Sequence, residues 1–570
     1  MNGEGVLQGI NLIKSTAAAV ISAILVGCST NPLPLDPVIG DTGQALSEIA
    51  IKTDVTHYDL ALEVIPNKKR LKGLSKTDFT ILAPTRFVEL KLDSRFTITA
   101  ITSQDKPLNF KRNQGVITID LGEQKAPGSV TSVSVAYEGQ PHIAKNAPWD
   151  GGFVFSQTES GEPWIATAVQ GEGCDLFWPC KDHFADKADS MRIRLTVPNG
   201  LSAVSNGVLQ TITQLSDNKQ QFDWLLSVPA SDYNIAINIG PYTRIQTEYT
   251  SVNGATVPIE FWSLTQNEQK ARELIDNDLR QQVTFFEKML GPYPWGGEKL
   301  GFVETPHLGM EHQTVNAYGK KYVRDPNGYD WLLQHELAHE WFGNLMTHEK
   351  LNDAWLHEGF GFYMQPSYSL YKFGDAAYNH SMYKAYLGLK NCAPVVLEGQ
   401  ITSDQAFNSD IYGKGGWTLH TLRWLVGEDV FWQATRELLY GVNNTASLTY
   451  PIAPRYRNTD EFISIVNRLT GKDYQWFFDV YLKQAELPEL EVTQTPHNIT
   501  LSWNTASLKG NKFPMPIPVE INGESNTYYP KEGRINIAIQ QGDHVVIDPQ
   551  MKVLRYLPII DKCSNEESKL

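Results

Sequence analysis

The chain has 570 residues, of which 41% are hydrophobic and 11% aromatic. This length and composition predict three or four domains with ordinary hydrophobic cores. The formal net charge of -15 argues against a nucleic-acid partner, because phosphate binding requires a basic face.

Residues 1–27 are predicted to be a signal peptide. A run of small and apolar residues follows Lys14, and it is shorter than the roughly 20 residues that a membrane-spanning helix needs. The run ends in Leu-Val-Gly-Cys at residues 25–28, which resembles the lipobox of bacterial lipoproteins. The resemblance implies lipidation of Cys28 and an exported lipoprotein on the periplasmic side of a membrane, with the outer membrane expected, or at the cell surface. An ordinary secretory signal with an incidental cysteine is the alternative.

Residues 28–50 are predicted to be a tether and residues 51–243 an antiparallel β domain. Apolar and polar side chains alternate in several stretches of this domain, among them residues 58–64, 191–197 and 233–239. Alternation with a period of two, broken by turn residues, is typical of half-buried strands.

The pattern changes after residue 243. Residues 267–290 carry apolar side chains at helical spacing, and the Gly-Pro-Tyr-Pro-Trp sequence at 291–295 ends the pattern. This predicts a long amphipathic helix near the start of a mainly helical domain over residues 244–486.

Residues 335–339 read His-Glu-Leu-Ala-His. Two histidines four apart on a helix share one face, so His335 and His339 can bind the same metal ion. Glu358, on the next apolar-periodic segment, can supply the third ligand of a catalytic zinc that keeps one position open for water. Glu336, beside the first ligand, can take a proton from a zinc-activated water.

Start and stop signals surround these two helices. Asp330 is the expected N-cap of the first helix, and Gly343 is expected to end it. Asp353 precedes the second helix and could cap it or orient a ligand histidine. A chance His-Glu-x-x-His is the alternative to a metal site, but requiring a glutamate at one fixed downstream spacing lowers its frequency to roughly 1 in 1000.

His335-Glu336-x-x-His339 followed by Glu358, in the setting Trp-Leu-x-Glu-Gly-Phe, resembles the zinc aminopeptidases of the M1 type, a branch of the gluzincins. The resemblance implies a multidomain α+β fold. Its parts would be an N-terminal antiparallel β-saddle domain, a thermolysin-like, mainly helical catalytic domain and a small C-terminal β-sandwich. It also implies a metalloprotease with one Zn2+ per chain that hydrolyses the N-terminal bond of peptides with a free N-terminus.

Two further segments match the substrate-binding parts of that family. Gln170 and Glu172 match residues that project from the first domain into the active site, which implies that Glu172 helps to hold the substrate's α-ammonium. Gly309, Met310 and Glu311 match the Gly-x-Met-Glu-Asn edge, where Glu311 is implied to grip the free amino terminus. A carboxylate suits this task because a charge-assisted hydrogen bond to an ammonium is strong.

Tyr412 lies in a Tyr-x-Lys-Gly sequence and matches the tyrosine that stabilises the oxyanion in the same family. A phenol stays protonated at neutral pH and can therefore donate a hydrogen bond. The sequence departs from the family at His312, which stands in place of the usual Asn and could titrate near neutral pH.

Alternation returns over residues 487–558, which are predicted to form the small β-sandwich, and residues 559–570 are expected to be a polar tail. We therefore expect the three-domain form of the family without its C-terminal helical domain. Once Cys28 is set aside four cysteines remain, and their pairing cannot be deduced from spacing. They are Cys174, Cys180, Cys392 and Cys563.

Two other functions remain as alternatives. One is a catalytically silent peptide-binding lipoprotein, and the other is a different hydrolase on the M1 scaffold, such as an epoxide hydrolase of the leukotriene A4 hydrolase kind. Glu336 and Tyr412 argue against the first, because a binding protein has no need of a general base. The signal peptide and the expected lack of a helical domain argue against the second.

Overall fold

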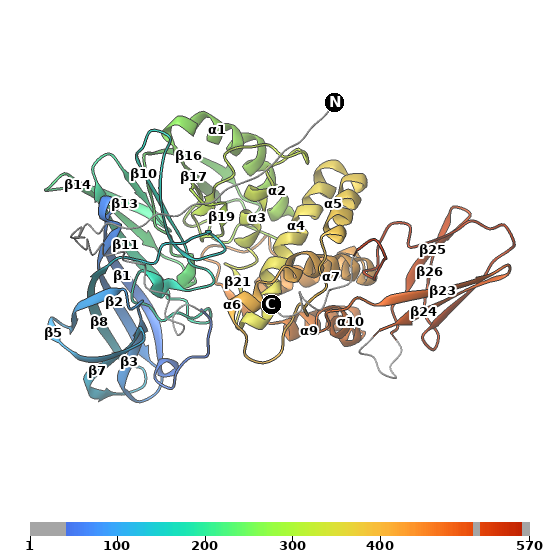
Figure 1. Ribbon diagram of the computed structural model, residues 1–570, viewed down its shortest axis with the longest axis horizontal. Helices are drawn as coiled ribbons and strands as arrows, with labels where there is room; N and C mark the ends of the chain where they lie inside the picture. Colours follow the sequence, from blue (N-terminus) through green and yellow to red (C-terminus); the bar gives the residue numbers. More distant parts are fainter. Residues whose placement is uncertain (1–41, 506–512, 561–570) are drawn as a thin grey trace, which may run out of the picture. The chain divides into compact units, whose positions relative to one another are not determined.

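The computed structural model describes residues 42–505 and 513–560 (Figure 1). The predicted signal peptide, Cys28 and residues 561–570 of the polar tail lie outside these ranges. Within the part of the chain that is described, no helix is both long and apolar enough to cross a membrane.

The described end of the predicted tether, residues 42–50, is packed against the rest of the protein. Thr42 is 1% exposed, and its hydroxyl donates to Asp182 Oδ1 over 2.7 Å. Gln44 Nε2 donates to the carbonyl of Ile401 over 3.3 Å. The packed chain therefore begins before residue 51, through contacts with partners distant in sequence that no local pattern reveals.

The N-terminal domain contains an eight-stranded, a four-stranded and a three-stranded sheet. Their strand orders are β13-β14-β11-β1-β2-β8-β4-β5, β12-β15-β10-β9 and β3-β7-β6. The strands are β1 (Thr53–Ile65), β2 (Arg70–Ile81), β3 (Thr85–Lys91), β4 (Phe96–Ser103), β5 (Lys106–Pro107), β6 (Asn109–Asn113), β7 (Val116–Lys125), β8 (Val130–Gly139), β9 (Gly152–Gln157), β10 (Pro163–Ala168), β11 (Ser190–Pro198), β12 (Ser202–Val204), β13 (Val208–Leu215), β14 (Lys219–Leu226) and β15 (Asn238–Gly240).

The predicted β domain is confirmed, with two differences. Strands β1 and β11 pair in parallel, whereas the other paired strands of this domain run antiparallel. Residues 233–239 were expected to form one strand, but Asp232–Asn234 form a 3-10 turn and only the short strand β15 follows. The turn breaks the strand because Tyr233 and Asn234 donate hydrogen bonds to Glu311, in the following domain.

The central domain, which was predicted to be catalytic, combines a five-stranded sheet, in the order β16-β17-β18-β20-β19, with ten helices of the described chain. Its strands are β16 (Tyr242–Thr250), β17 (Thr256–Leu264), β18 (Leu300–Glu304), β19 (Gly309–Met310), β20 (Asn316–Tyr318), β21 (Met346–His348) and β22 (Arg455–Arg457). Its helices are α1 (Glu268–Leu274), α2 (Arg280–Met289), α3 (Trp331–His339), α4 (Trp355–Phe373), α5 (Asp375–Leu387), α6 (Ser403–Ala406), α7 (Asp410–Val426), α8 (Glu428–Tyr440), α9 (Thr459–Thr470) and α10 (Gln475–Tyr481).

The long helix predicted for residues 267–290 is confirmed as one helical run. It consists of α1, a π-helical segment over Ile275–Leu279, and α2. Helix α4 packs against both α3 and α7 (Figure 1), which brings the two predicted metal-ligand helices together.

The C-terminal strands form the predicted β-sandwich as two three-stranded sheets, β23-β24-β27 and β26-β25-β28. The strands are β23 (Glu489–Thr495), β24 (Asn498–Asn504), β25 (Ile517–Ile521), β26 (Glu524–Tyr528), β27 (Arg534–Ala538) and β28 (Val545–Ile547). Alternating side chains such as Leu501, Val519 and Ile535 form a core separate from that of the other domains.

A disulfide joins Cys174 to Cys180, and Cys392 is disulfide-bonded as well. Cys563 lies outside the described residues. The Cys174–Cys180 bond closes the chain just after the Gln170–Glu172 segment, so it ties down the loop that was expected to reach the active site.

Candidate metal centre and active-site cleft

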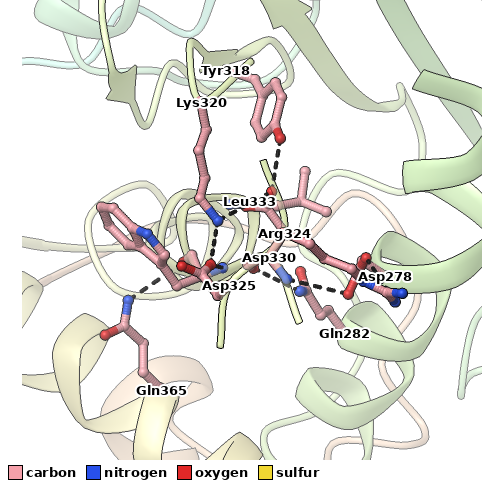
Figure 2. A network of polar contacts seen from close by, with 10 residues as sticks. Asp278, Gln282, Tyr318, Lys320, Arg324, Asp325, Asp330, Leu333 and Gln365 are labelled. Atoms are coloured by element: carbon pink, nitrogen blue, oxygen red, sulfur yellow. Dashed lines mark hydrogen bonds and ion pairs between the residues drawn. The ribbon is translucent and has the colours of Figure 1, made fainter. Parts of the chain in front are cut away.

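Helix α3 carries both histidines, and its first turn is held by a buried polar network (Figure 2). The Asp330 carboxylate accepts a hydrogen bond from the Leu333 amide over 3.0 Å, which confirms the predicted N-cap. Tyr318 donates its hydroxyl to Asp330 over 2.7 Å, and Gln282 Nε2 donates to the Asp330 carbonyl over 3.0 Å. These contacts from two other elements fix the rotation of α3 and therefore the direction of its histidines.

The three predicted metal ligands lie together. His335 Nε2 and His339 Nε2 are 3.2 Å apart, and Glu358 Oε2 lies 3.4 Å from His339 Nε2 and 3.8 Å from His335 Nε2. Ligand atoms about 2 Å from a tetrahedral zinc ion are separated from one another by roughly 3.3 Å. The three atoms are thus spaced as a single ion requires.

The chemistry of these ligand atoms also fits a metal. His339 Nδ1 lies 2.8 Å from the carbonyl oxygen of Phe342, so the other ring nitrogen is directed toward Glu358 and remains available to a cation. Glu358 is 3% exposed, and its Oε2 has no hydrogen-bond partner among the described residues. A buried carboxylate oxygen without a donor is costly unless a cation satisfies it. Two histidines and one glutamate are a ligand set of catalytic zinc.

Gly359 and Gly415 allow helix α7, which carries Tyr412, to lie close to helix α4, which carries Glu358. A side chain at Gly359 on α4 would begin 3.3 Å from the Gly415 Cα on α7, so larger residues would push the helices apart. Tyr412, in the first turn of α7, consequently reaches Glu358 with its hydroxyl. Burial raises the pKa of Tyr412 above its usual value and the Glu358 carboxylate raises it further, so the phenol stays protonated.

Glu336 points toward the strand expected to run along the substrate. A Cβ at Gly309 would lie 2.2 Å from Glu336 Oε1, so only glycine leaves room for this carboxylate. Gly309 belongs to β19, which forms the edge of the five-stranded sheet as predicted. Glu336 is 5% exposed, and burial raises its pKa well above the ordinary value, with the nearby Glu311 adding to the rise.

Glu311 is 3% exposed and is held by residues of the N-terminal domain and by Asn344 of its own domain. Its Oε1 accepts hydrogen bonds from Gln170 Nε2 over 2.5 Å and from the Tyr233 hydroxyl over 3.0 Å. Its carbonyl accepts from Asn344 Nδ2 over 2.9 Å and from Asn234 Nδ2 over 3.1 Å. The sequence analysis did not find Tyr233, Asn234 or Asn344. Only Asn344 offered a signal, because it closely follows the histidine motif.

Glu172 faces a different part of the same cleft. Its carboxylate lies against Gly151, where an added Cβ would be 1.9 Å from Oε2, and it accepts a hydrogen bond from the Gly151 amide. Burial raises the pKa of Glu172 to about 7, and repulsion from Asp150 and Asp404 contributes. Of the two residues matched in this loop, Gln170 donates a hydrogen bond to Glu311, whereas Glu172 is held by Gly151.

All the candidate site residues line one cavity of about 540 Å³. They are His335, Glu336, His339, Glu358, Tyr412, Gln170, Glu172, Gly309, Met310 and Glu311. A larger cavity of about 880 Å³ lies in the N-terminal domain, and none of these residues lines it. The residues predicted to be the metal ligands, the general base and the amine-binding carboxylate therefore face one cavity.

Three local expectations were wrong. His312 is fully buried, and burial lowers its pKa to about 3, so it does not titrate near neutral pH. Asp353 does not cap α4, because its carboxylate accepts hydrogen bonds over 2.9 and 2.5 Å from the amide and hydroxyl of Thr459, the first residue of α9, whose own N-cap is Asn458. Helix α3 ends at His339 rather than at Gly343, and a turn connects the two.

The fold and the site together define a class of protein. A histidine pair on one helix, a glutamate on the next, a buried glutamate beside the first ligand and an open cavity are features of the gluzincin class of metallohydrolase folds. The flanking β domain and C-terminal sandwich restrict the comparison to multidomain members.

Comparison with known proteins identifies the family. The peptidase M1 N-terminal domain matches residues 54–233, and the peptidase family M1 domain matches residues 282–481. Together these matches cover more than half of the sequence. The chain belongs to peptidase family M1.

Two curated relatives and one solved structure illustrate the match. The chain is 23% identical to aminopeptidase 2 of Candida albicans over 77% of its own length and 48% of that protein's. It is 27% identical to aminopeptidase B of Mus musculus over 68% of its own length and 63% of that protein's. A mutant M1 zinc metallopeptidase from Deinococcus radiodurans, crystallised with a Tyr-Ser-Ala substrate, matches with a TM-score of 0.64 and 22% identity, over 79% of this chain and 98% of that one. The chain thus spans less than two thirds of both curated relatives.

Proposed function

We propose that this protein is a zinc-dependent aminopeptidase that releases the first residue of peptides. The observation that carries the proposal is the placement of Glu311. Its buried carboxylate faces the same cavity as His335, His339 and Glu358, and Gln170 holds it in position. A carboxylate beside a metal site binds the ammonium of a peptide's free amino terminus, and this places the first peptide bond at the metal.

The chain's own residues account for the proton transfers of such a reaction. Zinc, when bound, supplies a Lewis acid that lowers the pKa of water and polarises the scissile carbonyl. Glu336 accepts a proton from the attacking water and returns it to the leaving amine. The Tyr412 hydroxyl donates a hydrogen bond to the oxyanion that forms at the carbonyl.

The remaining contacts hold the substrate. Glu311 binds the α-ammonium, Met310 and Gly309 run along the peptide at the sheet edge, and Gln170 orients Glu311. Glu172 is proposed to bind the amino-terminal residue as well, which its place in the lining of the same cavity supports.

Two features favour an aminopeptidase over the two alternatives, a catalytically silent peptide-binding protein and a different hydrolase on the same scaffold. Glu336 is buried where only a glycine at position 309 leaves room for its carboxylate, and a protein that merely binds peptides has no need of such a general base. An ammonium-binding carboxylate beside the metal favours peptides with a free amino terminus over epoxides, which carry no such charge.

The metal content of the purified protein tests the metal assignment. We expect purified protein to carry one zinc ion per chain. Glu358→Gln should weaken zinc retention, because a neutral amide is a poorer ligand than a carboxylate. Elemental analysis after dialysis against a chelator measures both, with the exposed Glu349→Gln as a control of equal charge change. Active protein without any divalent metal would overturn the assignment.

We also propose that Cys28 is lipidated and anchors the protein to a membrane, on the strength of the Leu-Val-Gly-Cys sequence at residues 25–28. The Cys28→Ala variant should move from the membrane fraction to the soluble exported fraction. Cell fractionation and intact-protein mass measure this change. A wild-type protein that is fully soluble and carries no lipid mass would refute the anchor.

A further inference from the structure

Glu340 directly follows the ligand His339, yet the proposed chemistry does not use it. Its side chain is 0% exposed and accepts five hydrogen bonds from neutral groups. The donors are the Tyr293 hydroxyl (3.1 Å), Trp295 Nε1 (2.9 Å), the Thr314 amide (3.1 Å), Asn316 Nδ2 (2.7 Å) and Asn344 Nδ2 (3.0 Å). Both carboxylate oxygens are used, so the group acts as a multiple acceptor at the end of the metal-binding helix.

Three of the five donors either belong to the segment that carries Glu311 or also form a hydrogen bond with it. The Thr314 amide and the Asn316 side chain belong to the chain just after Glu311. The Asn344 side chain donates both to Glu340 and, over 2.9 Å, to the carbonyl of Glu311. A single carboxylate therefore connects the helix of the metal ligands to the segment of the amine-binding residue.

We infer that Glu340 is a positioning residue that fixes the spacing between the amine-binding Glu311 and the metal ligands, which rests on the proposed aminopeptidase function. The spacing decides which bond of the peptide reaches the metal once the ammonium is bound. A misplacement of about 1 Å far from the reacting atoms can cost roughly 100-fold in rate. Glu340 thereby contributes to turnover without touching substrate.

The Glu340→Gln change isolates this role. Glutamine keeps the size of the side chain, but its NH2 group cannot accept a hydrogen bond. The NH2 group must therefore face N–H or O–H donors that pointed at a carboxylate oxygen in the wild type. Because two donors then oppose each other, the segment that carries Glu311 should shift relative to α3. A buried network that loses one acceptor also loses stability, so a control must reproduce that loss.

The chain offers a matched control in Glu287 on α2. This carboxylate is 5% exposed and accepts four hydrogen bonds from neutral donors. The donors are the Tyr249 hydroxyl (3.0 Å), Ser251 Oγ (2.7 Å), the Val252 amide (2.8 Å) and the Tyr293 amide (2.8 Å). Tyr293 also donates its hydroxyl to Glu340, but it lies outside the segment after Glu311, as do the other three donors. Glu287→Gln should therefore lower stability without changing the spacing.

The experiment compares wild type, Glu340→Gln and Glu287→Gln on one peptide and its N-acetylated twin, at equal zinc content and equal folded fraction. For Glu340→Gln, we expect kcat on the free peptide to fall about 10- to 100-fold, with KM within about threefold of wild type. The preference for the free over the acetylated peptide should also fall, by about tenfold. Glu287→Gln should keep wild-type kcat and preference.

Contrary outcomes are distinguishable. A wild-type protein that cleaves neither peptide overturns the proposed function and this inference with it. Normal wild-type activity with equal kcat in the two variants overturns the inference alone. If Glu340→Gln does not fold, Asn344→Ala removes the connection to Glu311 more gently and should lower kcat in the same direction. Unchanged kcat and preference in Asn344→Ala would then overturn the inference.

Discussion

Replacing Glu336 by glutamine is expected to lower kcat by about 10²- to 10⁴-fold while zinc and the fold are retained. The loss arises because the amide cannot accept the proton of the attacking water. The side chain keeps its size, so the fit against Gly309 and the three metal ligands is preserved. Steady-state kinetics on an aminoacyl-naphthylamide, together with zinc analysis, measure the effect.

The control for this variant is Glu349→Gln, an exposed glutamate close in sequence to the metal helices that does not line the cavity. It makes the same change of charge and should leave kcat unchanged. Near-normal kcat in Glu336→Gln at full zinc content would mean that another group activates the water.

The second expected result concerns the free amino terminus. Glu311→Ala should lower kcat/KM about 10- to 150-fold, because a hydrogen bond to a charged group is worth about 1.5–3 kcal/mol. Much of the loss should fall on kcat if the ammonium contact sets the register of the peptide at the metal. Wild-type protein should cleave an N-acetylated peptide poorly, because that peptide lacks the cation and leaves the buried Glu311 facing a neutral group.

The measurement is kcat/KM for a peptide and its acetylated twin in wild type, Glu311→Ala and Glu349→Gln. The Glu311→Ala variant should discriminate less between the two peptides, whereas the control should discriminate as wild type does. Equal cleavage of both peptides by wild type would disprove the exopeptidase assignment, even with zinc in place.

Most of the local structure around the site was predictable from the sequence. The Asp330 cap and the spacing of His335 and His339 on one helical face follow from neighbours a few residues away, whereas the edge position of Gly309 was implied by the family resemblance. Which side chains share a helix face and which residue caps a helix depend on residues within one or two turns, so both can be predicted from the sequence alone. The one-strand prediction for residues 233–239 failed because contacts with the catalytic domain outweighed alternation.

The sequence by itself therefore determined the fold class, the His-Glu-x-x-His motif with its downstream glutamate, and a set of candidate residues that line one cavity. Only the tertiary structure decided how these residues are partnered. It paired Glu311 with Gln170 and Tyr233, set Glu172 against Gly151, and bound Glu340 to donors from several segments. Asp353, which was expected to cap the adjacent α4, accepts its hydrogen bonds from Thr459 at the start of the more distant α9 instead. The physical reason is that a buried carboxylate must accept hydrogen bonds from whichever donors the folded chain places beside it. Those donors come from segments far apart in the sequence, and no periodic pattern in the sequence reveals such pairings.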